Sequence, residues 1–459
     1  MRYEDFLERK SQLGGRHGFE PLFMPDCMMD FQAHLTTWAL KRGRAALLED
    51  CGTGKTLQYL VWAQNIVEKT NENVLIATPL AVAPQTVSEG IKFGIECKQS
   101  RDGKSKGKIT VTNYEKLHLF DRSEYGAFVG DESGCMKNFE GVTKNAVTQF
   151  VKKMRYRLLC TATAAPNDYP ELGTHSEALG ELGYMDMLKR FFKNDNNTCD
   201  IKRNWRKHGG PPPKYRFLKH AEPAFWRFVA SWARAIRKPS DIGFDDGQFV
   251  LPELIENQHM VGNAEPLPGR LFPEDIIGMK DQRTELRRTL NDRCESAAQL
   301  AINQPGPSVC WAHLNTEGDL LTKLIPGAVQ IHGRQSDDEK EELLSGFVKG
   351  HFTKLVTKAS IAGFGLNWQH CGHMTVFPWH SFEEYYQSIR RSWRFGRLDP
   401  VNIDIVTTPG LSYVLANLKR KAKDAERMYA ELIAHMNEAI GIDRQVTFKD
   451  EARMPQWIL

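Results

Sequence analysis

The sequence lacks the features of membrane and secreted proteins. None of its 459 residues fall in an apolar run of about 18 residues, so we expect no transmembrane helix. The first 15 residues are strongly charged and contain no apolar stretch, so we expect no secretion signal. The nine cysteines form no Cys-x-x-Cys pair, which is against a disulfide framework. A reducing, cytoplasmic compartment and no membrane partner are therefore predicted.

The sequence also has little that indicates a structural metal. His370, Cys371 and His373 are close together, but no second group of Cys or His with ligand spacing accompanies them. A zinc site usually takes its four ligands from two such groups. We therefore expect no zinc there.

The small net charge of +4 conceals one strongly basic segment. Residues 189–238 hold 14 Lys/Arg and 3 Asp/Glu, and the rest of the chain is net negative. Aromatic residues lie between these charges, which suits a surface that follows phosphates and stacks on bases. The alternative is a solvated basic lid or protein-partner surface whose aromatics are core residues. The phosphate contacts predicted within this segment are Lys202, Arg203, Arg206 and Lys207.

Two blocks of the chain alternate short apolar runs with helical patterns. This alternation predicts parallel sheets covered by helices, and hence two α/β domains. The predicted strands of the first block are 45–48, 74–78, 109–112, 127–130 and 157–161. Those of the second block are 308–312, 329–331, 354–357, 374–377 and 402–406.

The pattern divides the chain into five parts. Helices are predicted over 56–68 and 337–349, and an amphipathic helix over 222–238 is ended by Lys238-Pro239-Ser240. Apolar residues from Leu411 to Met436 recur at helical spacing, which predicts a C-terminal helix packed on the second domain. The predicted parts are an N-terminal segment (1–30), a first domain (31–175), a largely helical basic insert (176–248), a second domain (249–410) and a C-terminal helical extension (411–459).

A glycine-rich loop follows the first predicted strand and leads into a helix. Its backbone N–H groups and the helix N-terminus would cradle phosphates. In the sequence Gly52-Thr53-Gly54-Lys55-Thr56, Lys55 would reach the β and γ phosphates and Thr56 would contribute its hydroxyl to Mg²⁺. The strict pattern places glycine where this chain has Glu49. By itself the loop is therefore either a nucleotide site or a glycine-rich turn.

Two adjacent carboxylates follow the predicted strand at 127–130. Asp131 would hold Mg²⁺, directly or through water, and Glu132 would orient and deprotonate the attacking water. Most Asp-Glu pairs are surface charges. The position at a strand end, downstream of a phosphate loop, favours nucleotide hydrolysis here.

From these motifs onward, residues 29–410 resemble superfamily-2 helicases, and within them the Swi/Snf-like ATPases and their phage relatives of the DEAD/DEAH type. An acidic residue at position 49 is common in that family. Phe31-Gln32 resembles the glutamine motif, so Gln32 is expected to read adenine. Thr78, Thr112 and Tyr114 lie in stretches that resemble the motifs that grip nucleic acid. Thr161-Ala162-Thr163 resembles the motif that couples hydrolysis to strand movement.

The second block carries the remaining motifs in the same order. The stretch with Gly365 resembles motif V, and Trp379 falls where the family usually has an aromatic residue. Gln387 to Arg397 resembles motif VI, in which Gln387 belongs to the coupling residues. Arg391 and Arg394 fall at the arginine-finger positions, with an error of one residue in this register left open.

The resemblance implies two RecA-like domains with ATP and Mg²⁺ between them and nucleic acid lying across both. The implied activity is an ATP-dependent DNA translocase or helicase acting on single- or double-stranded DNA, in the host cytoplasm if phage-encoded. Other replication or recombination proteins are expected among its partners. Asp131-Glu132-Ser133 in place of Asp-Glu-Ala-Asp favours DNA over RNA. An RNA helicase and a non-catalytic nucleic-acid-binding module are the alternatives.

Overall fold

The structure is a computed structural model that describes residues 17–163, 165, 168–194, 215–262, 279–362, 367–378 and 381–451. It divides into two compact units. Unit 1 comprises Met1–Asp245 and Glu426–Leu459, and unit 2 comprises Asp246–Ala425. Each unit is built on its own parallel sheet, so the prediction of two parallel α/β domains is confirmed.

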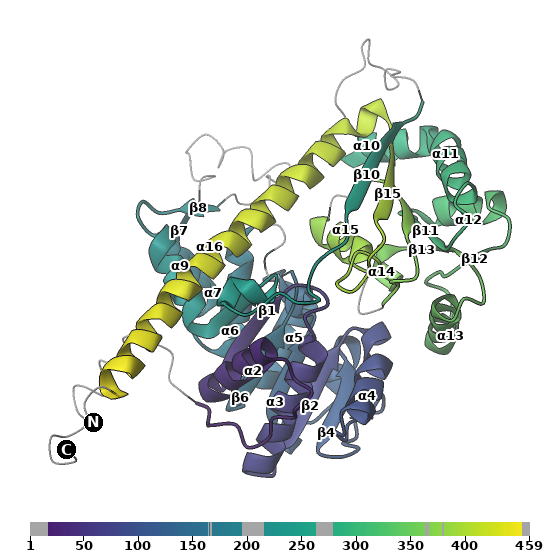
Figure 1. The fold of residues 1–459 in the computed structure, drawn as a ribbon. Helices are drawn as coiled ribbons and strands as arrows, with labels where there is room; N and C mark the ends of the chain where they lie inside the picture. The colour runs from purple at the N-terminus through teal and green to yellow at the C-terminus, as the bar shows by residue number, and fades with distance from the viewer. Residues whose placement is uncertain are drawn as a thin grey trace, which may run out of the picture. The chain divides into compact units, whose positions relative to one another are not determined.

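The sheet of unit 1 has seven strands in the order β3-β4-β2-β5-β6-β1-β9, and every pairing in it is parallel (Figure 1). The central strands are buried along nearly their whole length. This explains their continuous apolar runs, because a parallel sheet covered on both faces offers no solvated side for polar residues. The strands are β1 (Arg44–Glu49), β2 (Asn73–Thr78), β3 (Lys98–Gln99), β4 (Ile109–Asn113), β5 (Tyr125–Asp131), β6 (Tyr156–Cys160) and β9 (Ala233–Ile236).

Helices and short 3₁₀ turns connect these strands, as the crossovers of a parallel sheet require. The predicted helix over 56–68 is confirmed as α3. The helices of unit 1 up to the sixth strand are α2 (Asp30–Arg42), α3 (Lys55–Thr70), α4 (Ala83–Lys92) and α5 (Val142–Val151). The 3₁₀ turns are η1 (Leu80–Val82), η2 (Tyr114–Leu119), η3 (Arg122–Glu124), η4 (Ser133–Met136) and η5 (Tyr169–Glu171).

The segment predicted as an insert (176–248) belongs to unit 1 up to Asp245. A cluster of aromatic rings from its helices and hairpin forms its core, in which Phe192 and Phe217 stack at 4.7 Å between ring centroids. Its elements are α6 (Leu172–Leu179), α7 (Tyr184–Phe191), the antiparallel pair β7 (Phe192–Asn194) and β8 (Tyr215–Phe217), α9 (Glu222–Trp232) and η7 (Pro239–Ile242). Lys202, Arg203, Arg206 and Lys207 lie outside the described residues.

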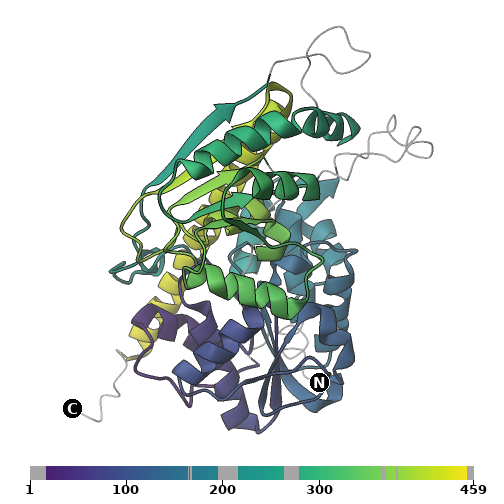
Figure 2. The same cartoon turned by 90° about the vertical axis from the view of Figure 1, so that its right-hand side faces the viewer.

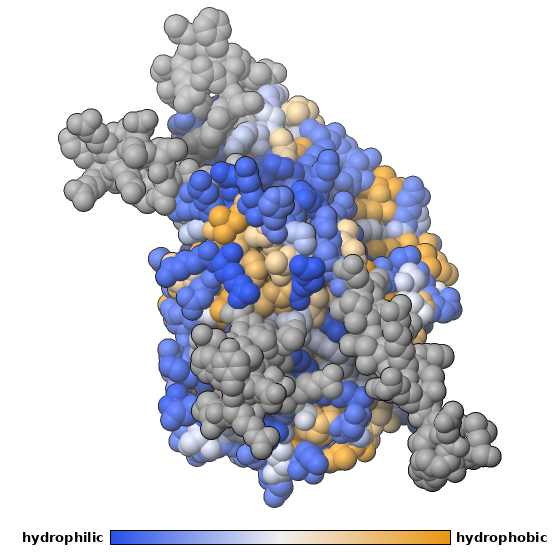
Figure 3. Space-filling model, turned by 90° about the vertical axis from the view of Figure 1, so that its left-hand side faces the viewer, coloured by the Kyte–Doolittle hydropathy of each residue, from blue (hydrophilic) through white to orange (hydrophobic). Residues whose placement is uncertain are grey.

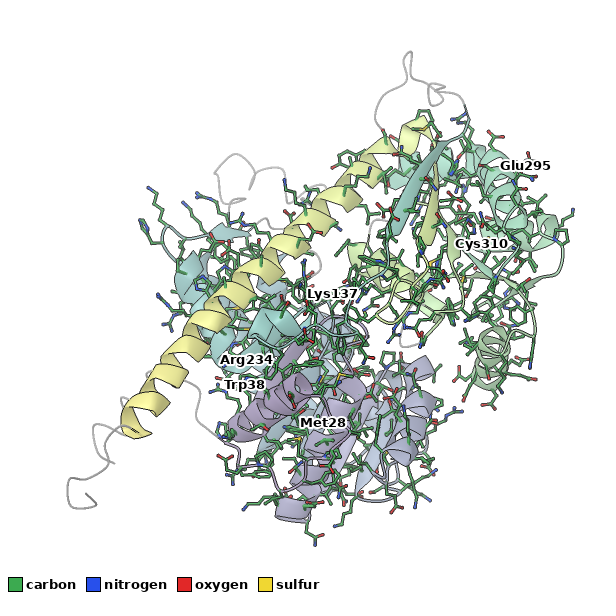
Figure 4. All side chains as sticks on the ribbon, viewed as in Figure 1. Met28, Trp38, Lys137, Arg234, Glu295 and Cys310 are labelled. Carbon is green, nitrogen blue, oxygen red and sulfur yellow. The ribbon has the colours of Figure 1, made fainter. Side chains whose placement is uncertain are left out.

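The prediction of one helix over 222–238 is wrong at its C-terminal end. Helix α9 ends at Trp232, and the next four residues form β9, which pairs in parallel with β1. These four residues are fully or almost fully buried, and Arg234 stacks its guanidinium 4.1 Å from the ring centroid of Trp38 on α2 (Figure 4). The main chain of residues 233–236 therefore bonds to β1 and does not continue the helix. The helical spacing of apolar residues in the sequence does not reveal this pairing with a distant strand.

The sheet of unit 2 has six parallel strands in the order β10-β15-β14-β11-β13-β12 (Figure 2). Alternate residues of its strands belong to different cores. Val309 and Trp311 pack in one apolar cluster and Cys310 in the other, so both faces of the sheet are covered. The strands are β10 (Leu254–Met260), β11 (Ser308–Trp311), β12 (Ala328–Gln330), β13 (Lys354–Thr357), β14 (His373–Val376) and β15 (Val401–Thr407).

The first of these cores holds residues of α13 to α16, and the second holds residues of α11 and α12. Ser336 caps α13 by accepting a hydrogen bond from the Glu339 N–H, which confirms the predicted helix start there. The helices are α10 (Met279–Arg288), α11 (Leu290–Ile302), α12 (Asn315–Leu324), α13 (Asp337–Val348), α14 (Ala359–Ala362), α15 (Phe382–Ile389), η8 (Pro409–Leu411) and α16 (Ser412–Glu451).

Helix α16 contributes to both units. Leu415 and Leu418 join the core of unit 2, as predicted for a C-terminal helix packed on the second domain. From Glu426 onward the helix belongs to unit 1, where Leu432 and Met436 are fully buried. The prediction is therefore correct for the first turns of the helix and incomplete for the rest.

All ten predicted strands are present, with ends that differ by at most two residues. Strand β10 was not predicted, because its sequence Leu-Ile-Glu-Asn-Gln-His-Met has only two apolar residues in succession. It lies at the edge of the sheet and pairs with β15 alone, which allows it to be polar.

None of the helices in the described part of the chain combines the length and hydropathy of a membrane span. On the face drawn in Figure 3, hydrophilic residues cover much of the described surface and apolar residues form separate patches. The most exposed large apolar side chains, Leu398, Val142 and Ile91, come from separate elements. Single exposed apolar residues of this kind are ordinary for a folded protein.

A chain of polar side chains crosses the sheet of unit 2 and is buried at Ser308, His373 and Asp404. Asp404 on β15 accepts hydrogen bonds from His373 Nε2 at 2.8 Å, His259 Nε2 at 2.9 Å and Asn257 Nδ2 at 3.1 Å. Ser308 lies 2.7 Å from the other ring nitrogen of His373. Burial raises the pKa of Asp404, but these hydrogen bonds outweigh burial and lower it to about 2. The clustered His373 is thus engaged in this chain of hydrogen bonds.

Because the pKa of Asp404 is lower in the folded state, its stabilisation is complete above about pH 4 and is lost as the pH falls towards 2. Asp404→Asn should destabilise unit 2 by about 2 kcal/mol at neutral pH, since it removes hydrogen bonds to a charged acceptor. Hydrogen exchange of the β14 and β15 amides, corrected for the intrinsic rate at each pH, measures the free energy of unfolding of unit 2. The exposed Asp399→Asn is the control, and an equal loss in both variants would contradict the expectation.

Candidate nucleotide site

The predicted motifs of unit 1 meet at one edge of its sheet. Strands β5, β6 and β1 are neighbours and parallel, so their carboxyl ends lie together. Asp131 ends β5, Thr161 follows β6, and the glycine-rich loop follows β1. Ligands of open α/β sheets bind at this end of the strands.

The loop between β1 and α3 takes its shape from its glycines. Gly52 and Gly54 have φ angles of 91° and 87°, which residues with a Cβ adopt only at a cost. Gly54 is the N-cap of α3, and the helix begins at Lys55. The first N–H groups of a helix have no partner within it, so they point towards the space in front of the loop and favour an anion.

Lys55 is buried against the main chain of the loop. Its Nζ donates to the carbonyl oxygens of Glu49 at 2.8 Å and Asp50 at 2.9 Å. Burial lowers its pKa, but the acidic groups around it, Cys51 and Glu132 first among them, raise it overall. The side chain is therefore a fixed positive charge at the edge of the loop.

The departure from the strict loop pattern at position 49 has a structural explanation. The side chain of Glu49 is fully buried beneath the loop, and its Oε2 accepts a hydrogen bond from Gln58 Nε2 at 2.8 Å. Burial raises the pKa of Glu49, against the opposing effect of Lys55. The residue thus ties the start of α3 to the end of β1.

Asp131 and Glu132 form an adjacent pair of buried carboxyl groups. Their residues are 5% and 8% exposed. Glu132 has a φ of 49°, an uncommon backbone conformation for a residue with a side chain and one found at functional sites. Burial and the neighbouring Glu132 raise the pKa of Asp131, and Lys55 lowers it. Two close carboxyl groups that repel each other favour a cation between or beside them.

Gln32 lies against the glycine-rich loop. Its Nε2 donates to the Thr53 carbonyl oxygen at 2.8 Å, and its Oε1 accepts from the Met29 N–H at 3.0 Å. A Cβ on Gly54 would stand 2.2 Å from Gln32 Nε2, so a side chain there would displace the Gln32 amide from the loop, and the φ of 87° itself favours glycine. The predicted role of Gln32 in reading adenine stays a prediction.

The segment Thr161-Ala162-Thr163 is held by several hydrogen bonds. The Thr161 N–H donates to the Leu47 carbonyl oxygen at 3.1 Å, and the Thr163 N–H donates to Thr161 Oγ1 at 3.1 Å. Tyr429 of α16 donates its hydroxyl hydrogen to the Ala162 carbonyl oxygen. Burial raises the pKa of Tyr429, and Asp50 of the loop is the largest charged contributor.

Ser133 connects the carboxylate pair to this segment. Its hydroxyl donates to the Cys160 carbonyl oxygen at 3.2 Å and lies 3.0 Å from His175 Nε2. Burial lowers the pKa of His175 to about 4, so its ring is neutral at physiological pH. A neutral ring can accept or donate in this contact without adding charge to the site.

Thr78, Thr112 and Tyr114, predicted to contact nucleic acid, are all buried in unit 1. Thr78 Oγ1 donates to the carbonyl oxygen of Pro79 at 3.0 Å, and the Tyr114 hydroxyl donates to that of Asp131 at 2.8 Å. The contact of these side chains with nucleic acid stays a prediction.

The motif predicted to supply the arginine fingers lies in unit 2, at the end of α15 and in the turn after it. Arg390 is enclosed by aromatic rings, 5.1 Å from the ring centroid of Trp393. Arg397 donates to the carbonyl oxygens of Gln369 and Asp399. Gln387 and Arg391 are buried, and Arg394 is partly exposed. Gly365 and Trp379 lie outside the described residues.

Sequence reasoning missed four side chains of the site in unit 1: Gln58, Tyr59, His175 and Tyr429. A signal existed for Tyr59, which is four residues after Lys55 and therefore on the same face of α3. None existed for His175 or Tyr429, because only the fold brings α6 and α16 to the edge of the sheet.

These residues fit a nucleotide with its Mg²⁺. The loop offers N–H groups and Lys55, whose two carbonyl partners can be exchanged for phosphate oxygens. Thr56 and Asp131 supply the oxygen ligands that Mg²⁺ prefers. They would hold the ion, while Glu132 stays available as a base.

Comparison with known proteins gives partial matches. No protein-family model matches the chain. It is 23% identical over 175 residues to the SWI/SNF chromatin-remodeling complex subunit snf22 of Schizosaccharomyces pombe, and 27% identical over 146 residues to the chromatin structure-remodeling complex subunit snf21 of the same organism. The matches cover 33% and 28% of this chain and 10% and 12% of those proteins, so the chain spans only a small part of their length.

Among solved structures, the chain is similar to the Sulfolobus solfataricus SWI2/SNF2 ATPase core, both in complex with dsDNA and as the core domain. Identity is 16% in both, with TM-scores of 0.41 and 0.40, and 85% of this chain is covered. The matches cover 90% and 87% of those chains. In sequence, the chain is similar to parts of two chromatin-remodeling complex subunits. Its fold is assigned here from its own two parallel sheets, and the predicted closeness to phage helicases stays a prediction.

Gly54→Ala should weaken nucleotide binding at least tenfold. The new Cβ would meet Gln32, and a residue with a Cβ is strained at a φ of 87°. Gly94→Ala is the matched control: its φ is 70°, but nothing lies within 4 Å of the added Cβ. It should cost about 1 kcal/mol of stability and leave binding intact. Titration with a fluorescent ATP analogue measures the nucleotide affinity of both variants. An equal loss of affinity in Gly54→Ala and Gly94→Ala would contradict the assigned loop geometry.

Proposed function

We propose that this protein is an ATP-dependent DNA translocase that hydrolyses ATP at the edge of the unit 1 sheet. The observation that carries the proposal is the meeting of Lys55, Asp131 and Glu132 at that edge, beside a glycine-rich loop. Each is buried, and Lys55 offsets part of the repulsion between the two carboxyl groups. Such an arrangement is costly unless a ligand uses it.

In the proposed mechanism the phosphates lie against the loop N–H groups, and Lys55 moves its hydrogen bonds from the Glu49 and Asp50 carbonyls to phosphate oxygens. Thr56 and Asp131 hold the ion. Mg²⁺, when bound, neutralises phosphate charge and so favours attack at the γ-phosphorus. Glu132 takes the proton of the attacking water, while the bond between the γ-phosphorus and the bridging oxygen breaks and ADP leaves. The backbone conformation of Glu132 sets the direction of its Cα–Cβ bond.

The proposal assigns the arginine fingers to Arg391 and Arg394 of unit 2. Their positions follow from the motif VI register, four and seven residues after Gln387. A finger stabilises charge that develops in the transition state. It requires that unit 2 approach the nucleotide during the catalytic cycle, as the motif VI resemblance implies.

DNA is the proposed polymer because the similar proteins are Swi/Snf subunits and a SWI2/SNF2 core in complex with dsDNA. The test is ATP turnover with single-stranded DNA, duplex DNA, forked duplex or RNA, with Lys55→Ala as the inactive control. Stimulation by duplex DNA supports a translocase, and strand separation on the fork supports a helicase. Stimulation of ATP turnover by RNA alone would favour an RNA helicase. The absence of ATP turnover with every polymer would favour a non-catalytic binding module.

Glu132→Gln should bind ATP normally but hydrolyse it at least about a hundredfold more slowly, because the base is lost while the phosphate and ion contacts remain. Nucleotide affinity and single-turnover hydrolysis measure the two effects separately. Glu124→Gln, an exposed residue just before the other end of β5, is the matched control. A parallel fall in affinity and turnover would show that the roles of Asp131 and Glu132 are misassigned.

Arg394→Ala should lower kcat on the order of a thousandfold, with little effect on ATP binding, because a finger acts in the transition state. Arg397→Ala is compared under the same conditions, together with the melting temperature of each variant. An unchanged kcat in Arg394→Ala with a large loss in Arg391→Ala or Arg397→Ala would place the motif in another register.

A further inference from the structure

Two buried tyrosines contact Asp131 from different elements of unit 1. The Tyr114 hydroxyl donates to its carbonyl oxygen, and the Tyr59 hydroxyl faces its carboxylate. We propose that Tyr59 is a positioning residue that sets the orientation of the Asp131 carboxylate for the divalent cation. This inference rests on the proposed function, since it concerns the cation of the same site.

Tyr59 lies on α3, one turn after Lys55, and is fully buried. Its hydroxyl oxygen is 3.5 Å from Asp131 Oδ2 and 2.9 Å from Thr86 Oγ1 on α4. Thr86 Oγ1 in turn lies 3.2 Å from the Val82 carbonyl oxygen. A chain of hydroxyl groups therefore runs from α4 through α3 to the end of β5.

The direction of the hydrogen bonds follows from the proposed cation-bound state. A carboxylate that holds a cation is ionised and only accepts, so with the ion bound the single hydrogen of the Tyr59 hydroxyl would point at Asp131. Thr86 then donates its own hydrogen to Tyr59 or to the Val82 carbonyl. In this arrangement Thr86 holds the Tyr59 hydroxyl in place, and Tyr59 limits the rotation of the carboxylate about its Cβ–Cγ bond.

Tyr114 fixes the main chain at the same residue. Its hydroxyl is 2.8 Å from the Asp131 carbonyl oxygen, and it approaches over Gly130. A Cβ on Gly130 would stand 3.0 Å from that hydroxyl, tighter than ordinary packing. The main chain is therefore held by Tyr114 and the side chain by Tyr59, and rotation of the carboxylate is the freedom that Tyr59 removes.

The competing view is that Tyr59 is a core residue whose hydroxyl needs only its threonine neighbours, Thr86 and Thr56. The two views differ in what the loss of the hydroxyl does to cation binding. If Tyr59 orients the carboxylate, Tyr59→Phe should weaken cation binding while keeping the ring that fills the core. If it only packs, Tyr59→Phe should change stability alone.

The experiment measures the affinity for Mn²⁺ in the presence of ADP, by electron paramagnetic resonance of free Mn²⁺, on the full chain. Asp131→Asn should weaken binding at least about tenfold, and Tyr59→Phe about three- to tenfold, the value of one ordinary hydrogen bond, because the contact with Asp131 is long at 3.5 Å. Thr86→Val should act in the same direction but more weakly. The double variant Tyr59→Phe/Thr86→Val should bind Mn²⁺ no more weakly than Tyr59→Phe alone, since Thr86 acts through Tyr59.

The matched control is Tyr125→Phe, which removes the hydroxyl of another buried tyrosine at the opposite end of β5. It should leave Mn²⁺ affinity unchanged. The proposal is overturned if Tyr59→Phe binds Mn²⁺ within twofold of the unmodified protein, or if Tyr125→Phe weakens binding as much. ATP turnover of the unmodified protein is measured in parallel. Its absence, with the expected Mn²⁺ series, would overturn the proposed hydrolysis and leave the role of Tyr59 standing.

Discussion

The site in unit 1 depends on a balance of buried charges around Lys55. Its ammonium lies among Glu49, Cys51, Asp131 and Glu132, which raise its pKa. Without Lys55, the buried carboxyl groups would carry uncompensated charge, and without them the ammonium would be buried alone. Either change is expensive in a protein interior. The glycine-rich loop, the end of β5 and the first turns of α3 are consequently fixed as one arrangement.

The parts of the chain outside the recognised motifs support this arrangement. Strand β9 extends the sheet beside β1, and its Ile236 carbonyl oxygen accepts from the Asp50 N–H at 2.9 Å. Tyr429 of α16 bonds to the Ala162 carbonyl oxygen, and Met436 packs with its sulfur close to the Ala235 N–H. Segments remote in sequence from the loop therefore enclose it, which keeps its main-chain groups in a fixed geometry.

Unit 2 shows a different use of buried polar groups. Its chain from Ser308 through His373 and Asp404 to His259 ties three central strands and the edge strand β10 together. This chain accounts for how a strand as polar as β10 joins the sheet. The motif with the arginines follows α15, where aromatic rings and main-chain carbonyls engage Arg390 and Arg397.

The sequence by itself determined the two parallel sheets, all ten strands that read as apolar runs, and the order of the motifs. It did so because buried parallel strands and phosphate loops depend on local composition and on glycine conformations. Only the tertiary structure decided that residues 233–236 form a strand, that polar β10 joins a sheet, and that α16 belongs to both units. It also decided that His175 and Tyr429 lie beside the site. These outcomes depend on pairing and packing between segments distant in sequence, and no local pattern records them.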